Sequence, residues 1–428
     1  MTNLKNILNY LLFSFIENIL ELKQKKTNYN KRPLLNSAIK QDKNLWVYAT
    51  SIGELHATEL FIKEAIKSCG INNVIILTDH PHYSESFNKL FPQAIIVDHG
   101  VSGYIKDTMN AYPPSIFILA EIPCFLSDAP CRLSYKVLHY AKSHDATTLV
   151  INGWLYNESP PSRMDQLEYA LLNKYYIQKI DCFLVQNDTI KDRLLEMGAP
   201  AESVHATGNM KYDYLNLDNQ KITPPDSLRT LLPALASAER KIFTAGCITQ
   251  EKDINLIVEA LLNIIADEPD TLFIIAPRYP DKKENTDVIT HSLIENNIPY
   301  IFRSSTNKPI EKNYNVLILD TIGELKYLYS ISKACYVGVN HNLLEPLIYA
   351  KPVFTSSGWE KNYPSFDVFQ HMKKVELIVE INDSIELTAL IKKHLSDQED
   401  NGIKDKLALL ANFQGATKKS LQRLQELL

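Results

Sequence analysis

A short motif occurs twice in this chain, and each copy carries a glutamate that could perform acid–base chemistry. The copies read Ser51-Ile-Gly-Glu54-Leu55 and Thr321-Ile-Gly-Glu324-Leu325, and each follows an apolar run and opens an amphipathic stretch. A carboxylate in this place can take a proton from a hydroxyl group. Ser/Thr-x-x-Glu is also a capping box, in which the hydroxyl and the carboxylate satisfy free amides of the first helical turn. Spacing alone leaves both roles open for Glu54 and for Glu324.

Residues that could hold a phosphate follow the apolar runs of the second half. Arg278 comes soon after the run 272–276 and can form charge-assisted bonds to a phosphate, although a surface arginine in a proline-rich turn has the same appearance. The turn Gly246–Thr249 and the helix start Asn342–Glu345 occupy corresponding places, where backbone amides can bind anions. For His341 we expect a binding role and not a catalytic one.

The elements that must position these residues are predicted by the alternation of short apolar runs with longer amphipathic stretches. This is the pattern of βα units in a mostly parallel sheet, and a second series of units begins near residue 240. Between the series, residues 214–239 contain three prolines and no steady period, which is typical of a linker. We therefore predict an α/β protein with two doubly wound, Rossmann-like domains that face a cleft, with ligands at the carboxyl ends of the strands. Strands are expected at 45–49, 73–77, 94–97, 116–119, 148–151 and 182–185, and then at 241–245, 272–276, 300–302, 316–319, 334–337 and 352–355.

The N-terminal segment, residues 1–32, combines an apolar helical face with a basic flank. Polar residues such as Glu17 and Glu21 interrupt the apolar face, which argues against a membrane-spanning helix and against a signal peptide. We expect an amphipathic helix that lies in the surface of an anionic membrane without crossing it. The alternative is a first helix that packs on the body of the protein. The basic flank consists of Lys23, Lys25, Lys26, Lys31 and Arg32.

Composition excludes several classes of function. With 45 Lys+Arg against 50 Asp+Glu, the net charge of −5 excludes a nucleic-acid binder that works by overall basicity. Six cysteines without zinc-type or Cys-x-x-Cys spacing indicate free thiols in a reducing compartment. We expect no metal site, and we interpret Asp79-His80-Pro81-His82 as a polar loop. A Walker loop, a dinucleotide-binding Gly-x-Gly-x-x-Gly and a Gly-x-Ser-x-Gly elbow are missing, which argues against kinases, dehydrogenases and esterases.

The local motifs, taken in chain order, are similar to those of one known family. In the first half they are Trp46-Val-Tyr-Ala-Thr-Ser-Ile-Gly-Glu54, Ala120-Glu121-Ile122-Pro123, Val150-Ile-Asn152, Gln186, Glu196-Met-Gly-Ala199 and Thr207-Gly-Asn-Met-Lys-Tyr-Asp213. In the second half they are Ala245-Gly-Cys-Ile-Thr-Gln-Glu251, Pro277-Arg278, Leu319-Asp-Thr-Ile-Gly-Glu-Leu325, His341-Asn-Leu-Leu-Glu-Pro346 and Lys351-Pro352. This ordered set resembles the 3-deoxy-D-manno-octulosonic acid (Kdo) transferases, which add Kdo to lipid A precursors and have the two-domain glycosyltransferase-B fold. The resemblance covers nearly the whole chain, including an N-terminal membrane-associating helix.

Departures from the family pattern mark a divergent member. The glycine-rich loop of the second domain is reduced to Val337-Gly-Val-Asn340, and Pro-Arg-His has become Pro277-Arg278-Tyr279. The first-domain Glu-Thr-Glu-Leu-Trp-Pro is reduced to Leu119-Ala-Glu121-Ile-Pro123, and Asn-Ala-Arg-Leu has become Asn152-Gly-Trp154-Leu155.

The resemblance implies an inverting glycosyltransferase that moves Kdo, or a related acidic sugar, from its CMP-activated form to a lipid A precursor-type acceptor in lipopolysaccharide biosynthesis. It implies no metal or other cofactor, and a peripheral or monotopic location on the cytoplasmic face of the bacterial inner membrane. Three alternatives remain open. They are a same-fold transferase with another nucleotide sugar, a sugar-nucleotide epimerase of similar fold, and a catalytically inactive, membrane-bound paralogue.

The family's site residues carry over to matching positions of this chain. Glu54 takes the place of the catalytic base in an acceptor-binding domain, residues 33–213. The nucleotide-sugar domain is expected at 240–428, and its terminal helix could pack back on the first domain. Acceptor-binding residues are expected at Ser51, Gly53, Thr78, Glu121 and Asn152. Donor-binding residues are expected at Lys211, Gly246, Thr249, Arg278, Gly323, Glu324, His341, Asn342 and Glu345, with a solvated lysine as the alternative for Lys211.

Overall fold

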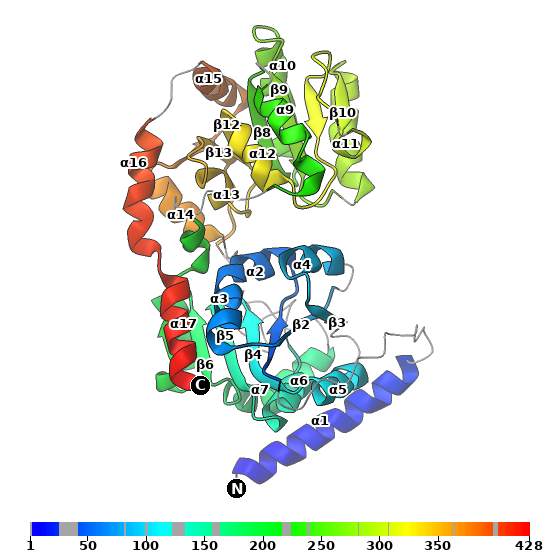
Figure 1. Ribbon diagram of the computed structural model, residues 1–428, viewed down its shortest axis with the longest axis vertical. Coiled ribbons are helices and arrows are strands. Elements are labelled where there is room, and N and C mark those ends of the chain that lie inside the picture. Colours follow the sequence, from blue (N-terminus) through cyan, green and yellow to red (C-terminus); the bar gives the residue numbers. More distant parts are fainter. Residues whose placement is uncertain are drawn as a thin grey trace. The chain divides into compact units, whose positions relative to one another are not determined.

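The computed structural model describes residues 2–24, 42–80, 83–98, 102–121, 133–155, 163–215, 224–237, 240–280, 282–306, 308–361, 363, 365–396 and 401–428. These residues form two compact units, each with its own parallel sheet and its own core (Figure 1). Unit 1 comprises Met1–Asp213 together with Phe413–Leu428, and unit 2 comprises Tyr214–Asn412. The chain therefore leaves unit 1 after Asp213 and returns to it at Phe413.

The described part of unit 1 contains a seven-stranded sheet in the order β3-β2-β1-β4-β5-β6-β7, with every pair of neighbours parallel. Alternate side chains enter opposite cores, since Trp46 and Tyr48 join one apolar cluster and Leu45 and Val47 the other. The strands are β1 Asn44–Tyr48, β2 Asn73–Thr78, β3 Ile95–Asp98, β4 Pro114–Ala120, β5 Thr147–Gly153, β6 Cys182–Val185 and β7 Val204–Ala206.

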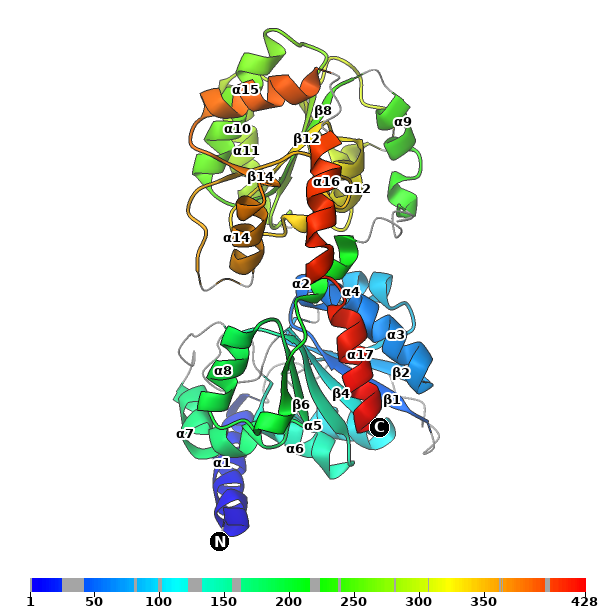
Figure 2. The same ribbon diagram turned by 90° about the vertical axis from the view of Figure 1, so that its left-hand side faces the viewer.

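Helices cover both faces of this sheet. One core includes side chains of α1, α5, α6, α7 and α8, and the other includes side chains of α3, α4 and α17. Figure 2 shows α17 beside α3, in agreement with their contacts. The helices are α1 Thr2–Gln24, α2 Ile52–Ala57, α3 Glu59–Cys69, α4 Ser84–Leu90, α5 Ser102–Ala111, α6 Tyr135–Ser143, α7 Arg163–Ile177, α8 Asp188–Glu196 and α17 Ala416–Leu427, with 3-10 turns η2 Ala201–Ser203 and η3 Met210–Leu215.

Helix α1 packs on unit 1 through one face and leaves the other face exposed. Phe13 is buried in the core, Tyr10 contacts the rings of Tyr135 and His139, and the Asn9 amide donates to the carbonyl oxygen of Leu171 at 2.9 Å. Among the described residues, none of the helices is long and apolar enough to cross a membrane. The exposed apolar side chains of α1 are Leu4, Ile7, Leu8, Leu11, Leu12 and Phe15.

The described part of unit 2 repeats the architecture, with a parallel sheet in the order β10-β11-β9-β8-β12-β13-β14. Its strands are β8 Ile242–Ile248, β9 Leu272–Pro277, β10 Tyr300–Phe302, β11 Val316–Ile318, β12 Ala334–Val337, β13 Val353–Ser356 and β14 Ile378–Ile381. Its helices are α9 Leu231–Ser237, α10 Glu251–Ile265, α11 Lys283–Glu295, α12 Leu325–Ile331, α13 Leu344–Leu347, α14 Phe366–Lys374, α15 Ser384–Leu395 and α16 Asn401–Leu409, with 3-10 turns η5 Asp226–Leu228, η6 Arg303–Ser305 and η7 Leu410–Phe413.

The predicted α/β class with two doubly wound units is confirmed, and all twelve expected strands are present with small changes at their ends. Two strands, β7 and β14, were not expected, because both are short and carry polar residues. Part of the expected linker is also different, since residues 226–237 form η5 and α9 and bury Leu228, Leu231 and Leu235 in unit 2. These leucines are spaced three and four residues apart, which is a helical pattern that the prolines obscured.

Candidate active site

In unit 1 the predicted site residues lie at the carboxyl ends of neighbouring strands. Glu54 follows β1, Glu121 follows β4, Asn152 ends β5 and Lys211 follows β7. Because the carboxyl ends of parallel strands meet at one edge of the sheet, these side chains gather there, as they do in other doubly wound folds.

Glu54 belongs to the first turn of α2, and its capping box is present. The Ser51 hydroxyl accepts from the Glu54 amide at 3.2 Å, and the Glu54 carboxylate accepts from the Ser51 amide at 3.2 Å. The carboxylate also accepts from the Thr50 amide at 2.7 Å and from the Thr50 hydroxyl at 3.0 Å. The capping role proposed from the spacing is therefore real, and three donors hold the carboxylate in one orientation.

Glu54 is also an acid whose ionisation is disfavoured. Its side chain is buried, and burial raises its pKa to about 7 against the hydrogen bonds of Thr50 and Ser51, which lower it. The negative charge of Glu121 raises the pKa further. A carboxylate with a pKa close to neutral pH is suited to accept a proton and to release it again. Capping and proton transfer are thus compatible in this residue.

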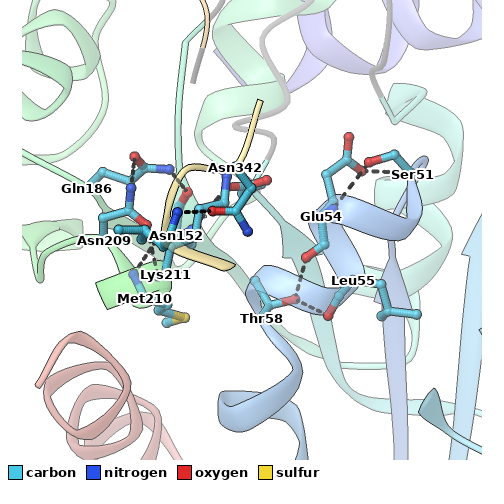
Figure 3. A network of polar contacts seen from close by, with 12 residues as sticks. Ser51, Glu54, Leu55, Thr58, Asn152, Gln186, Asn209, Met210, Lys211 and Asn342 are labelled. Atoms are coloured by element: carbon cyan, nitrogen blue, oxygen red, sulfur yellow. Dashed lines mark hydrogen bonds and ion pairs between the residues drawn. The ribbon is translucent and has the colours of Figure 1, made fainter. Parts of the chain in front are cut away.

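Glu121 is held by a lysine and an amide from two other elements. Lys211 Nζ lies 2.5 Å from Glu121 Oε1, and the Asn152 amide donates to the same oxygen at 3.1 Å. Figure 3 shows Asn152 and Lys211 together with other polar residues of this edge. Both Glu121 and Asn152 have positive φ angles, 64° and 52°. This backbone region is costly for a side chain other than glycine, and such strain is concentrated at functional sites. The expected donor-binding lysine is thus engaged with the carboxylate of Glu121.

Two further members of this edge, Gln186 and Asn209, were not among the expected site residues. Asn209 Nδ2 donates to Gln186 Oε1 at 2.9 Å, and Gln186 Nε2 donates to the Asn152 carbonyl oxygen at 3.0 Å. The Asn152 side chain accepts in turn from the Met210 amide at 2.8 Å. Gln186 follows β6, an expected strand, so its position after a strand end was the signal that could have revealed it, whereas Asn209 follows β7, a strand that the sequence did not predict.

The remaining acceptor-side residues lie nearby in the chain but make other contacts. Gly53 is exposed, and a side chain there would meet only the Ser51 hydroxyl, at 3.8 Å. Thr78 ends β2, is buried, and accepts from the His80 amide at 3.2 Å. In the described contacts Thr78 is not joined to the network of Glu121. Pro81, His82 and the segment 122–132 lie outside the described residues.

In unit 2 the predicted donor residues lie at the carboxyl ends of β11, β9, β8 and β12, which are consecutive in the sheet. Two glycines allow the backbone to pack closely there. A Cβ on Gly246 would lie 1.9 Å from the Tyr329 hydroxyl oxygen, and one on Gly338 would lie 2.3 Å from the Cys247 carbonyl oxygen. Cys247 itself has φ 58°, at an irregularity in the pairing of β8 with β9. The retained Gly338 is therefore required by packing.

Arg278 and His341 form a polar cluster at this edge. The Arg278 guanidinium lies over the Tyr279 ring, 5.6 Å from its centroid, and acts electrostatically on the Cys247 thiol. Burial and the nearby charge of Arg278 lower the pKa of His341 to about 3, so its ring is neutral at physiological pH. His341 Nε2 is buried without a hydrogen-bond partner in the described structure. A charged guanidinium beside a neutral imidazole with an unused nitrogen can bind an anion and a hydroxyl group.

The remaining donor-side residues differ in what they offer. The Asn342 side chain accepts from the Leu344 amide at 3.2 Å and donates to Glu345 at 3.4 Å, and Glu345 acts electrostatically on Cys247 and Tyr329. Thr249 and Gly323 are exposed, and Gly323 has φ 86°.

For Glu324 the capping hypothesis is wrong. Helix α12 begins only at Leu325, and the Glu324 side chain makes no capping bond. Its carboxylate is instead buried in an ion pair, with Arg303 Nε at 2.9 Å and Nη2 at 3.0 Å, and it accepts from the Thr321 hydroxyl at 2.7 Å. The second copy of the motif therefore has a different function from the first, because a buried cation competes for its carboxylate. This ion pair also leaves Glu324 a poor candidate for direct donor binding.

The chain is similar to known proteins in both sequence and fold. Residues 21–214 match the family model of 3-deoxy-D-manno-octulosonic-acid transferase (kdotransferase). The chain is similar to a 3-deoxy-D-manno-octulosonic acid transferase of Haemophilus influenzae, with 25% identity over 82% of this chain and 78% of the relative. It is 27% identical to a bifunctional glycosyltransferase/methyltransferase of Fusobacterium nucleatum over 77% of this chain. The chain spans about half (49%) of the length of that relative.

Among solved structures, a UDP-N-acetylglucosamine 2-epimerase aligns with a TM-score of 0.59 at 14% identity, over 91% of this chain and 96% of that chain. At this identity the likeness concerns the fold alone.

Proposed function

Because this chain is a divergent member of the Kdo transferase family, with the glycosyltransferase-B fold, we propose that it transfers Kdo from CMP-Kdo to a lipid A precursor-type acceptor in lipopolysaccharide synthesis. The single observation that carries the proposal is Glu54, a buried, oriented carboxylate with a pKa near 7 at the carboxyl edge of the family-matched domain. We further propose that the reaction inverts the configuration at the anomeric carbon and that it needs no metal.

In the proposed reaction Glu54 is the general base. The acceptor hydroxyl oxygen forms the new bond to the anomeric carbon and gives its proton to the Glu54 carboxylate, while the bond from that carbon to the phosphate oxygen of CMP breaks. The base stands on the face opposite the leaving group, and the transition state resembles an oxocarbenium ion, as in glycoside hydrolysis. The leaving group is a phosphate, so it requires stabilisation of negative charge and no general acid.

For the donor we propose the edge of unit 2. Arg278 is the cation that binds the phosphate. The neutral imidazole of His341 donates or accepts a hydrogen bond, and the Glu345 carboxylate is suited to accept hydrogen bonds from the ribose hydroxyls. These residues are supported by their clustering around Cys247 at the ends of β8, β9 and β12.

We expect Arg278→Ala to weaken CMP binding by about 1.5–3 kcal/mol, roughly 10- to 150-fold in Kd, because a charged hydrogen bond is lost. Calorimetric titration with CMP measures the change. Arg229→Ala is the matched control, since Arg229 is an exposed arginine of the same unit whose ion-pair partner among the described residues is the exposed Asp226. The Kd of Arg229→Ala for CMP should remain within about twofold of the wild type. If Arg278→Ala binds CMP with unchanged affinity, Arg278 is not part of the donor site. If crystals soaked with CMP show its electron density only near Thr78 or Glu121, the donor site lies in unit 1.

We also propose that α1 binds the surface of an anionic membrane, which places the enzyme peripherally at the cytoplasmic face of the inner membrane. Support comes from the exposed face of α1, where Leu8 is 57% and Leu12 50% exposed while Phe13 anchors the helix. The basic flank at Lys25, Lys26, Lys31 and Arg32 lies outside the described residues. Packing on unit 1 and binding to lipid thus use different sides of the same helix.

Liposome flotation tests this surface. Leu8→Glu/Leu12→Glu should reduce binding to anionic vesicles by at least about tenfold. The reason is that burial of each leucine side chain in the bilayer would stabilise the bound state by about 1.5–3 kcal/mol. Raised salt should weaken binding as well. Ile385→Glu, at a 76% exposed apolar position of α15, is the matched control and should float as the wild type does. Flotation that is equal in all three proteins would contradict the proposal.

Donor titration tests the function itself. Transfer from CMP-Kdo to a lipid A precursor, followed by mass spectrometry, is the expected result. Transfer only from another nucleotide sugar would assign a different donor to the same fold. Conversion of a free nucleotide sugar would indicate an epimerase, and inertness toward every donor, with lipid binding retained, would indicate an inactive paralogue.

A further inference from the structure

The 3-10 turn η3 connects two parts of unit 1 that are far apart in the sequence. Its Lys211 belongs to the carboxyl-edge network, as described above. Two residues later, Asp213 Oδ1 accepts from the Gly415 amide at 2.5 Å, and Asp213 Oδ2 accepts from the Thr417 amide at 2.7 Å. These amides belong to the first turn of α17, 202 and 204 residues further along the chain.

Asp213 supplies what α17 lacks. The N-cap position of α17 is Gly415, with φ 96°, and it has no side chain to satisfy the free amides. A carboxylate at this end also complements the helix dipole. The neighbouring Tyr212 ring stacks on Phe413 at 5.4 Å between centroids, and the Ser420 hydroxyl donates to the Thr207 hydroxyl at 3.1 Å. The segment around η3 is thus fastened to α17 at several points.

The other end of η3 is fastened to the site. The Lys211 amide donates to Asn209 Oδ1 at 3.0 Å, the Met210 amide donates to Asn152 Oδ1, and Lys211 Nζ reaches Glu121. Lys211 and Asp213 are two residues apart in η3, a rise of about 4 Å in a 3-10 helix, so they are close parts of one turn. A displacement of Asp213 would therefore be transmitted to Lys211.

We propose that Asp213 is a positioning residue for the transfer reaction: by binding the first turn of α17 it fixes η3, and so holds Lys211 against Glu121, the carboxylate at the end of β4, the strand next to the one that Glu54 follows. This inference rests on the proposed role of Glu54 as the base.

The charges at the site give the expected consequence. Glu54 lies among the amides and hydroxyls of Thr50 and Ser51, and within the described residues the charge that acts on it is that of Glu121, from the end of β4. Glu121 is in turn held by Lys211 from η3 and by Asn152 from β5. If Lys211 withdraws, the negative charge of Glu121 acts on Glu54 without compensation, and ionisation of Glu54 becomes harder.

The experiment is the pH dependence of kcat/KM in Asp213→Ala, with Lys211→Met as the direct reference. We expect the acidic limb to move to higher pH by about 0.5–1 unit in both variants. Asp383→Ala is the matched control, because Asp383 caps α15 in unit 2 by accepting from the Glu386 amide at 2.8 Å. Asp383→Ala should lose a similar amount of stability, and the acidic limb of its kcat/KM profile should stay at the wild-type pH. If Asp213→Ala does not fold, Asp213→Asn keeps the shape and one acceptor, and a smaller shift in the same direction is expected.

A second readout separates this inference from the proposed function. In protein labelled with ¹³C at glutamate carboxyls, the Glu54 signal, assigned from its loss in Glu54→Gln, titrates without any turnover. An upward shift of this titration in Asp213→Ala supports the inference even if CMP-Kdo proves not to be the donor. A Glu54 titration that is identical in the wild type, Asp213→Ala and Lys211→Met would overturn it, whatever the stability of the variants.

Discussion

Replacement of Glu54 by glutamine is expected to lower turnover by roughly 10²- to 10⁴-fold, the usual contribution of a general base. Glutamine keeps the shape of the side chain, and its oxygen can still accept from the amides of Thr50 and Ser51, so the capping box survives. Donor affinity should be unchanged. Steady-state kinetics with CMP-Kdo, together with CMP titration, measure both quantities.

The pH dependence gives a second signature of Glu54. Burial raises its pKa to about 7, so kcat/KM of the wild type should fall as the pH drops below about 7 and the carboxylate is protonated. The pKa in the unfolded chain is lower, so folding favours the protonated acid, and the stability that Glu54 contributes is lost as the pH rises through 7. The melting temperature of Glu54→Gln at pH 8 should therefore equal or exceed that of the wild type.

Glu59→Gln is the matched control for Glu54→Gln. Glu59 begins the next helix and pairs with His56 at 2.9 Å and with Lys63, outside the network of Glu121. The turnover of Glu59→Gln should remain within about twofold of that of the wild type. A stable Glu54→Gln protein that binds CMP and transfers at more than about a tenth of the wild-type rate would exclude Glu54 as the base, and Glu121 would be the next carboxylate to test.

The second large effect is expected at Arg303, which pairs with Glu324 in the interior of unit 2. Both side chains are buried, and Arg303 also donates to the carbonyl oxygens of Ser227 and Thr306 at 2.6 Å. Arg303→Met should destabilise unit 2 by about 3–5 kcal/mol, because a buried carboxylate is left without its cation. Hydrogen exchange of peptides from β11 and α12, measured by mass spectrometry, reports this loss locally.

Removal of both charges should restore much of the stability. The double variant Arg303→Met/Glu324→Leu leaves no buried charge, and replacing buried pairs by apolar residues is often close to neutral. Arg229→Met, at an exposed pair with Asp226, should cost about 1 kcal/mol or less. If Arg303→Met alone cost no more than Arg229→Met, the ion pair would not be what holds the Thr321–Glu324 segment.

Local patterns in the sequence were sufficient for the parts of the structure that depend on neighbours in the chain. Apolar runs such as 182–185 and 334–337 became strands with the expected ends, and the Ser51 capping box formed as its spacing predicts. Contacts between distant residues left no such trace. Glu54 and Glu324 stand in nearly identical motifs, and the ion pair that Arg303 of η6 forms with Glu324 distinguishes them.

The same limit applies to Lys211. Its sequence neighbours gave no indication that its partner would be Glu121, which lies 90 positions earlier, because the pairing depends on the order of strands in the sheet. The strand before Glu121 was predicted, whereas β7, the short strand before Lys211, was not. The position after a strand end therefore indicated Glu121 but not Lys211, and the ion pair between them had no signal in the sequence.

The discontinuous composition of unit 1 has a consequence for the order in which the chain is made. Strands β1–β7 leave the ribosome before unit 2, whereas α17, with Ala416 and Leu424 in the unit 1 core, is made only after it. At about 5–20 residues per second, the roughly 200 residues of unit 2 take on the order of 10–40 s to synthesise. Through that interval one apolar face of the first sheet lacks α17, and Asp213 has no helix end to bind. A nascent chain therefore acquires the anchored Lys211 only after α17 has been made, so an unfinished chain has the sheet but not the anchored site.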